Sequence, residues 1–188
     1  MIKNSILLIL LIALTGCNGK TYYEKKQEEL AVEKRNYDNG LSSSHKVLIT
    51  NILERDISLN KTTIPRKKSI LVIQKRKGEI IPYISINDKL KSKGYNVTYD
   101  SNELDYIVVV KSKGIKNGTY SDGSDAWDNE TNIYAIDTKT EKINLIESQY
   151  EKAPDRVQTI RNREPSDYGA RGIEGNELTE LIIDKVLR

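Results

Sequence analysis

The chain of 188 residues contains no phenylalanine and only one cysteine, one histidine and one tryptophan. The single cysteine, Cys17, cannot form a disulfide within the chain, so a packed core must provide the stability. A metal site built on histidine or cysteine would need several such ligands, which the chain lacks. A serine hydrolase is disfavoured because no Gly-x-Ser-x-Gly sequence is present and His45 follows the polar residues Ser42 to Ser44.

Neither positive nor negative charge predominates in the chain. Thirty Lys and Arg residues are balanced by 27 Asp and Glu residues, which gives a net charge of +3. Nucleic-acid binding needs a concentrated basic surface, so this balance argues against it. The spacing of the glycines matches neither of the two common phosphate-binding motifs, so the sequence does not support nucleotide binding.

The longest apolar run, Ile6 to Leu14, lies at the extreme N-terminus between Lys3 and the sequence Leu14-Thr15-Gly16-Cys17. As a helix, nine residues would cover roughly 14 Å of a hydrocarbon core about 30 Å thick, too little for a permanent membrane span. A cation, a short apolar stretch and small residues before a cleavage point form the usual layout of a secretory signal.

This segment resembles the signal peptide and lipobox of a bacterial lipoprotein. The resemblance implies cleavage after Gly16 and attachment of acyl chains such as palmitate to Cys17, which would anchor the protein to a membrane. The remaining 172 residues would carry a net charge of +2, since only Lys3 is charged in the signal. Asn18, in place of Asp, implies an outer-membrane protein facing the periplasm in a Gram-negative host, and otherwise a protein anchored to the cell membrane.

The polar composition that follows predicts a stalk over residues 17–45, with a solvated helix from Thr21 to Asn36. Turn and linker residues such as Asn39-Gly40 and Ser42 to Ser44 are expected to end it. A single domain is predicted over residues 46–188, beginning with a helix from Val47 to about Glu54.

The domain is predicted to be α/β, with one small mixed sheet of about five strands. A β-branched strand at 69–74, a helix starting at Pro82 and ending at Lys93-Gly94, and a strand at 95–99 form a strand–helix–strand unit with parallel pairing. A third strand begins at 105–110, and residues 132–136 and 142–147 form a hairpin. Residues 151–175 are expected to form a long loop before a C-terminal helix over 177–187, for which Asn176 is the N-cap.

This order of elements, with the segment Ile133 to Ile143 as its hairpin, resembles small α/β domains of envelope lipoproteins. The curli secretion lipoprotein, the outer-membrane activator of penicillin-binding proteins and the N-terminal domain of the Tol-system propeller protein share this layout. The resemblance covers roughly residues 69–188, and segments 114–131 and 151–175 depart from it. It concerns the fold, and no family binding motif carries over to this chain.

Four carboxylates, those of Asp122, Asp125, Asp128 and Glu130, lie within nine residues. An oxygen-rich loop of this kind suits calcium, but the spacing is not that of an EF-hand, and a solvated loop between strands explains it better. Trp127, in the same segment, is either an exposed anchor for a partner or a cover for the sheet edge. No cofactor is otherwise expected.

Arginines are the other candidates for binding. The long loop contains Arg156, Arg161, Arg163 and Arg171, whose guanidinium groups suit carboxylate or phosphate, although interleaved acidic residues favour a self-neutralising surface. The sequence therefore predicts a non-enzymatic, membrane-anchored envelope lipoprotein whose domain binds a protein or peptidoglycan partner. The alternatives are a periplasmic immunity lipoprotein that neutralises a toxin and, third, a small cell-wall hydrolase using paired carboxylates.

Overall fold

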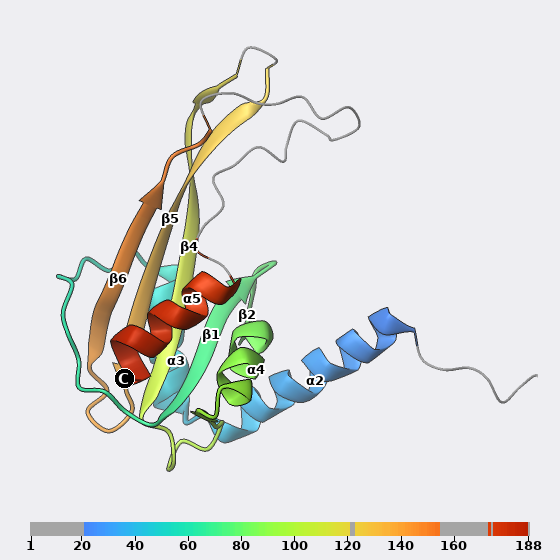
Figure 1. Cartoon of the computed structure of the whole chain (residues 1–188), viewed down its shortest axis with the longest axis vertical. Helices are drawn as coiled ribbons and strands as arrows, with labels where there is room; N and C mark the ends of the chain where they lie inside the picture. The colour runs from blue at the N-terminus through green and yellow to red at the C-terminus, as the bar shows by residue number, and fades with distance from the viewer. Residues whose placement is uncertain (1–20, 121–122, 155–172, 174, 188) are drawn as a thin grey trace, which may run out of the picture.

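A mixed β-sheet with helices on both faces forms the body of the protein, and this α/β fold agrees with the prediction (Figure 1). The computed structural model describes residues 21–120, 123–154, 173 and 175–187. The sheet has six strands, one more than expected. The strands are β1 Ser69–Arg76, β2 Glu79–Pro82, β3 Asn96–Val97, β4 Tyr106–Thr119, β5 Asp125–Asp137 and β6 Ile143–Glu151. The helices are α2 Tyr22–Gly40, α3 Ser43–Glu54, α4 Ile84–Ser92 and α5 Gly175–Ile182, followed by the π-helix η2 Ile183–Leu187.

The strand order is β2-β1-β4-β5-β6, and β3 also pairs with β1. The parallel pairing of β1 with β3 confirms the predicted strand–helix–strand unit, although β3 is shorter than expected. Strand β2 was not predicted. Lys77 and Gly78, at φ 50° and 83°, form the tight turn that leads into it, because two-residue hairpin loops favour positive φ. Pro82 ends β2, so its predicted place in the first turn of α4 is wrong.

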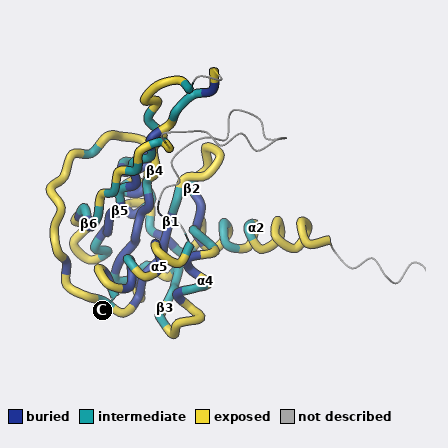
Figure 2. Tube along the Cα trace, turned by 45° about the horizontal axis from the view of Figure 1, so that its top comes forward, coloured by how far each residue is buried: buried dark blue, intermediate teal, exposed yellow. Residues whose placement is uncertain are grey.

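Two apolar layers sandwich the sheet. Helices α4, α5 and η2 cover one face, which includes Val72, Val108 and Ala135. The end of α2 and helix α3 cover the other, which includes Ile73 and Val109. Ile133 and Ala135 belong to the first layer and Tyr134 and Ile136 to the second, as the alternation in the sequence predicted. Figure 2 shows these strands as the buried centre of the body.

The C-terminal helix agrees with the prediction in position and in its apolar face. Leu178, Ile182 and Val186 are buried against the first layer. Its start differs, because the helix begins at Gly175 and Asn176 lies inside it. The Asn176 side chain accepts a hydrogen bond from Lys89 Nζ at 2.9 Å and so links α5 to α4 instead of capping the helix.

The predicted stalk is helical, and residues 22–29 of α2 are exposed along its projecting half (Figure 2). Its last part differs from the expected linker. Tyr37 and Leu41 are buried beside α3, and Ser42 caps α3 by accepting the His45 N–H at 3.2 Å. Ser101 donates its hydroxyl to the Gly40 carbonyl oxygen at 2.9 Å. The packed part of the protein therefore includes residues before 46, and the α2–α3 joint is fixed to it.

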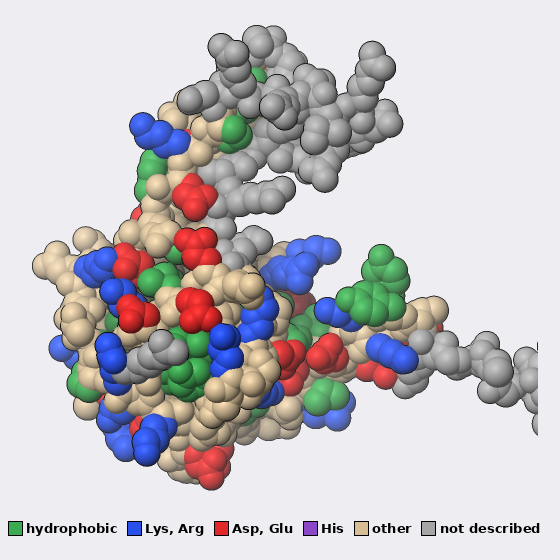
Figure 3. Space-filling model, in the orientation of Figure 1, with side chains coloured by type: hydrophobic (Ala, Val, Ile, Leu, Met, Phe, Trp, Pro, Cys, Tyr) green, Lys and Arg blue, Asp and Glu red, His purple; other side chains and the backbone are tan. Residues whose placement is uncertain are grey.

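Within the part of the chain that the structure describes, no helix combines the length and the apolar character needed to cross a membrane. Charged side chains of both signs are interspersed over the body in Figure 3. This agrees with the nearly balanced charge of the sequence.

Candidate binding arm

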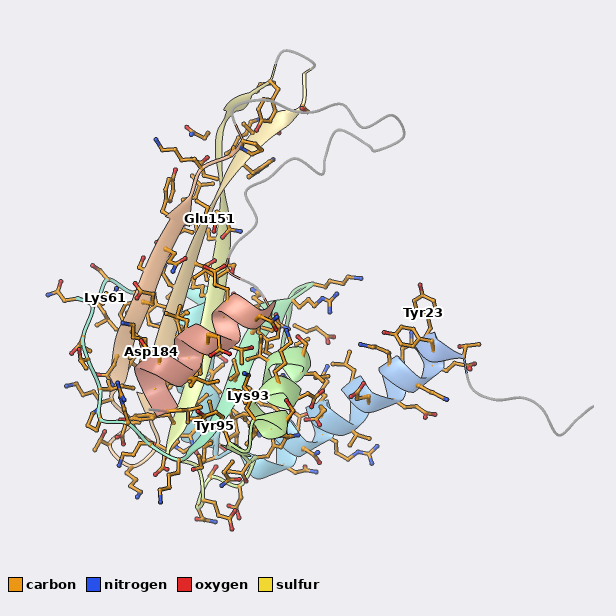
Figure 4. The ribbon with its side chains drawn as sticks, in the orientation of Figure 1. Tyr23, Lys61, Lys93, Tyr95, Glu151 and Asp184 are labelled. Atoms are coloured by element: carbon orange, nitrogen blue, oxygen red, sulfur yellow. The ribbon has the colours of Figure 1, made fainter. Side chains whose placement is uncertain are left out.

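Strands β4, β5 and β6 continue beyond the body as a twisted ribbon (Figure 1). We call this ribbon the arm and define it as residues 111–119, 125–132 and 148–151. Strand β1 pairs with β4 only as far as Gln74 and Val110, whereas β4 and β5 pair from Tyr106 to Thr119. Figure 4 labels Glu151 on the arm, beyond the helices. The arm therefore presents side chains away from both apolar layers.

Polar side chains hold the arm together where the body uses apolar ones. Thr131 is only 1% exposed, and its hydroxyl lies 3.1 Å from the Ser112 hydroxyl and donates to Asn129 Oδ1 at 3.0 Å. A backbone bond adds to these side-chain contacts at the tip, where the Tyr120 N–H donates to the Ser124 carbonyl oxygen at 2.8 Å. Because these contacts are hydrogen bonds, the arm lacks the apolar alternation by which strands are found in a sequence.

Asp128 joins the end of β6 to β5. Its Oδ1 accepts the Ala153 N–H at 2.7 Å, and its Oδ2 accepts the Tyr150 hydroxyl. The Ala153 N–H, followed by the Tyr150 hydroxyl, lowers the pKa of Asp128 below its ordinary value. The hydrogen bond between the Tyr150 hydroxyl and Asp128 also raises the pKa of Tyr150. Asp128 therefore has a positioning role in the arm. This contact was not predicted from the sequence, because the partners of Asp128 lie more than twenty residues away.

Trp127 lies on β5 opposite Lys116 and is 40% exposed. Its ring packs over the backbone of Gly114, where an added Cβ would lie 3.5 Å from Trp127 Cε3. The ring thus lies against β4 while part of it contacts solvent. The sequence left two alternatives for Trp127, an exposed anchor for a partner and a cover for the sheet edge. The structure has features of both, because Trp127 covers part of the sheet and remains accessible.

The acidic segment forms a strand, so the predicted loop between strands is wrong for residues 125–130. Asp125 pairs with Lys116 at 2.7 Å, and Glu130 accepts the Asn132 side-chain amide at 2.8 Å. Asp122 lies outside the described residues. Among the described residues, no three His, Cys, Asp or Glu side chains are grouped so that they could hold a metal ion. Asp125, Asp128 and Glu130 each have a protein partner instead.

Other predicted site residues lie outside the described part of the chain. These are Cys17, Arg156, Arg161, Arg163 and Arg171. His45, in contrast, is described and is 5% exposed within α3. Its Nε2–H donates to the Thr138 carbonyl oxygen at 3.1 Å, and its buried Nδ1 has no hydrogen-bond partner. The ring thus links α3 to the β5–β6 turn.

Comparison with known proteins gives no family for this chain. No protein-family model matches it, and the search of curated proteins finds no significant match.

Proposed function

We propose that this protein is a lipid-anchored protein of the bacterial envelope that uses its arm to bind another protein or a cell-wall component, without catalysing a reaction. The protruding arm, which exposes Trp127 and Tyr150, is the observation that carries the binding proposal. Trp and Tyr are enriched at interface hot spots because a rigid ring buries much apolar area on binding.

The N-terminal half of α2 supports the spacing part of the proposal. The whole of α2, with 19 residues, is about 28 Å long, since each residue adds 1.5 Å, and its N-terminal half is the part that projects. Thr21 caps the helix and Glu24 completes a capping box, which stabilises its exposed N-terminal end. Tyr23 lies at the outer end of α2 in Figure 4 and is 79% exposed. A lipid on Cys17 would then hold the domain at a distance from the membrane and raise its local concentration there.

Photo-crosslinking in the native envelope tests the binding proposal. Benzoylphenylalanine replaces Trp127 in the full-length chain, and a matched variant carries it at Lys139, which is exposed in the turn after β5, at the end far from Trp127. We expect an adduct with one defined envelope component at position 127 and none at position 139. The same products at both positions, or none at position 127, would refute binding through Trp127.

Lipid attachment has its own test. Cells grown with an alkyne-bearing palmitate should label the full-length chain, and Cys17→Ser should abolish both the label and recovery in the membrane fraction. A matched Ser42→Ala variant keeps Cys17 and should be labelled as the unchanged chain is. Persistence of the label in Cys17→Ser would contradict the predicted lipidation site.

A further inference from the structure

In the part of the chain that the structure describes, the edge of β4 in the arm is open on the side where β1 ends. Strand β1 leaves β4 after the pair Gln74–Val110, and β4 continues to Thr119. Among the described residues, no strand pairs with β4 on that side beyond Val110. An open edge presents backbone N–H and C=O groups that an additional strand can pair with.

Three lysines lie beside this edge. Lys75 on β1 and Lys111 and Lys113 on β4 line a hollow of about 380 Å³, whose other wall includes Leu53 and Asp56 near the end of α3. We call this hollow the notch. The Lys111 ammonium donates to the Arg55 carbonyl oxygen at 2.6 Å, and its side chain is only 14% exposed. Part of this positive charge is therefore held in a fixed place.

The carboxylates of the notch neutralise these lysines incompletely. Glu54 forms an ion pair with Lys75 at 2.7 Å, whereas Asp56 is the shared partner of Lys111 and Lys113, each at 3.5 Å. Asp56 is 83% exposed, and such exposed, long ion pairs contribute little. Lys113, and then Lys111, lower the pKa of Asp56, so the notch favours a negative charge at this position.

We propose that the β4 edge binds an extended acidic segment of a partner protein by strand addition, with carboxylates of that segment replacing Asp56 beside Lys111 and Lys113. This inference rests on the proposed binding function and adds the chemistry of the partner. It uses the edge of the arm, whereas the crosslinking experiment uses the exposed ring of Trp127.

The spacing of the lysines indicates what the partner segment contains. Lys111 and Lys113 are two residues apart on one strand, so they lie on the same face, roughly 7 Å apart along it. A neighbouring strand with Asp or Glu at every second position would place its carboxylates at the same interval on the same face. The recognised pattern is therefore acid, any residue, acid, without proline where the partner must donate an N–H.

Fluorescence anisotropy with the full-length chain in detergent provides the first test. The probe is a labelled nonapeptide of alternating Glu and Val, and its reference is alternating Lys and Val. We expect saturable binding of the acidic probe only, about fivefold weaker for Lys113→Gln and about threefold tighter for Asp56→Asn. Lys93→Gln is the matched control, because Lys93 pairs with Glu180 on the body, away from the arm (Figure 4). Equal binding of both probes, or no saturation by about 1 mM, would overturn the proposal.

Hydrogen exchange then separates strand addition from simple charge attraction. The acidic probe should slow amide exchange within residues 111–119, and the same alternating Glu and Val peptide with every amide N-methylated, which has no amide donors, should bind at least tenfold more weakly. Unchanged exchange there, or equal binding of the N-methylated peptide, would refute strand addition. Peptide binding without a crosslink at position 127 would refute only the role of Trp127. A crosslink without peptide binding would refute only the acidic strand.

Discussion

Replacing Asn87 by alanine should strongly destabilise the domain, because this buried side chain completes the edge of β1. Asn87, on α4, is 2% exposed. Its Oδ1 accepts the Val72 N–H at 3.0 Å, and its Nδ2 donates to the Val72 carbonyl oxygen at 3.1 Å. On this edge, β3 pairs with Ser69 and Ile70, and β2 pairs from Ile73 onward. The side-chain amide thus pairs with β1 in the gap between two strands.

The expected loss follows from the groups that the substitution leaves behind. The buried Val72 N–H would have no partner, which costs about 1–3 kcal/mol. The Val72 carbonyl oxygen would keep the Tyr83 N–H at 2.8 Å, so losing the second bond to Asn87 adds about 1 kcal/mol. The total is about 2–4 kcal/mol of unfolding free energy, or a fall in melting temperature of roughly 4–16 °C for a domain of this size.

Urea and thermal unfolding, followed by circular dichroism, would measure this change. Asp88→Ala is the matched control, because Asp88 is exposed on the same helix, and it should change stability by no more than about 0.5 kcal/mol. Asn87→Asp is more demanding, since at neutral pH its carboxylate would face the Val72 carbonyl oxygen. It should be less stable than Asn87→Ala at pH 7 and regain stability when acid protonates it. A loss below about 1 kcal/mol for Asn87→Ala would refute this reasoning.

Three other variants test the joint, the turn and the arm. Gly40→Ala should lower the free energy of unfolding in urea by at least about 2 kcal/mol, because the added Cβ would lie 2.9 Å from Tyr99 Cβ. A loss below about 0.5 kcal/mol would contradict that close approach. Burial raises the pKa of Asp137, but hydrogen bonds, foremost from the Thr140 N–H, lower it overall. Asp137→Ala should therefore lower the free energy of unfolding by about 1–2 kcal/mol above about pH 4, and Asp137→Asn should lower it less. The difference from the unchanged chain should shrink at lower pH, where the native carboxylate becomes protonated. A difference that does not depend on pH would exclude this linkage. Trp127→Ala should lower the melting temperature by less than about 4 °C, since the ring is 40% exposed, and a larger fall would assign it to the core.

The apolar patterns of the sequence were sufficient to predict the centre of the fold. The run at 69–74 predicted a doubly buried strand, and residues 70–73 are fully buried. The alternation at 133–136 predicted which side chains face which layer, because successive side chains in a strand point to opposite faces. These predictions succeeded because burial of apolar surface decides both the local structure and the position of each element.

Apolar patterns could not predict the polar contacts between residues that are distant in the sequence. Asn87 resembles any helix-surface residue in the sequence, and only the gap between β2 and β3 gives it a partner. Residues 125–130 were predicted as a loop because they are acidic, whereas pairing with β4 makes them a strand. Gly40 was interpreted as a turn signal, but its role is to let α2 approach Tyr99 closely. The candidate site was predicted least well, because the arm consists of such contacts apart from Trp127.

The polar character of the arm has consequences for its proposed partner. A long ribbon with open edges invites nonspecific pairing, which natural sheets oppose with lysines and bulges. Strand β4 has both devices, with Lys111, Lys113 and Lys116 along the arm and a register shift between Lys116 and Gly118. Like charges would repel a second copy of β4 that pairs in the same place, whereas an acidic strand would be attracted. The lysines that protect the edge from self-association would therefore also select the partner, which predicts that Lys111→Gln and Lys113→Gln together increase aggregation while weakening binding of the acidic probe. Light scattering and anisotropy measured on the same sample would test both effects, and a change in either one alone would show that protection and selection are separate properties of this edge.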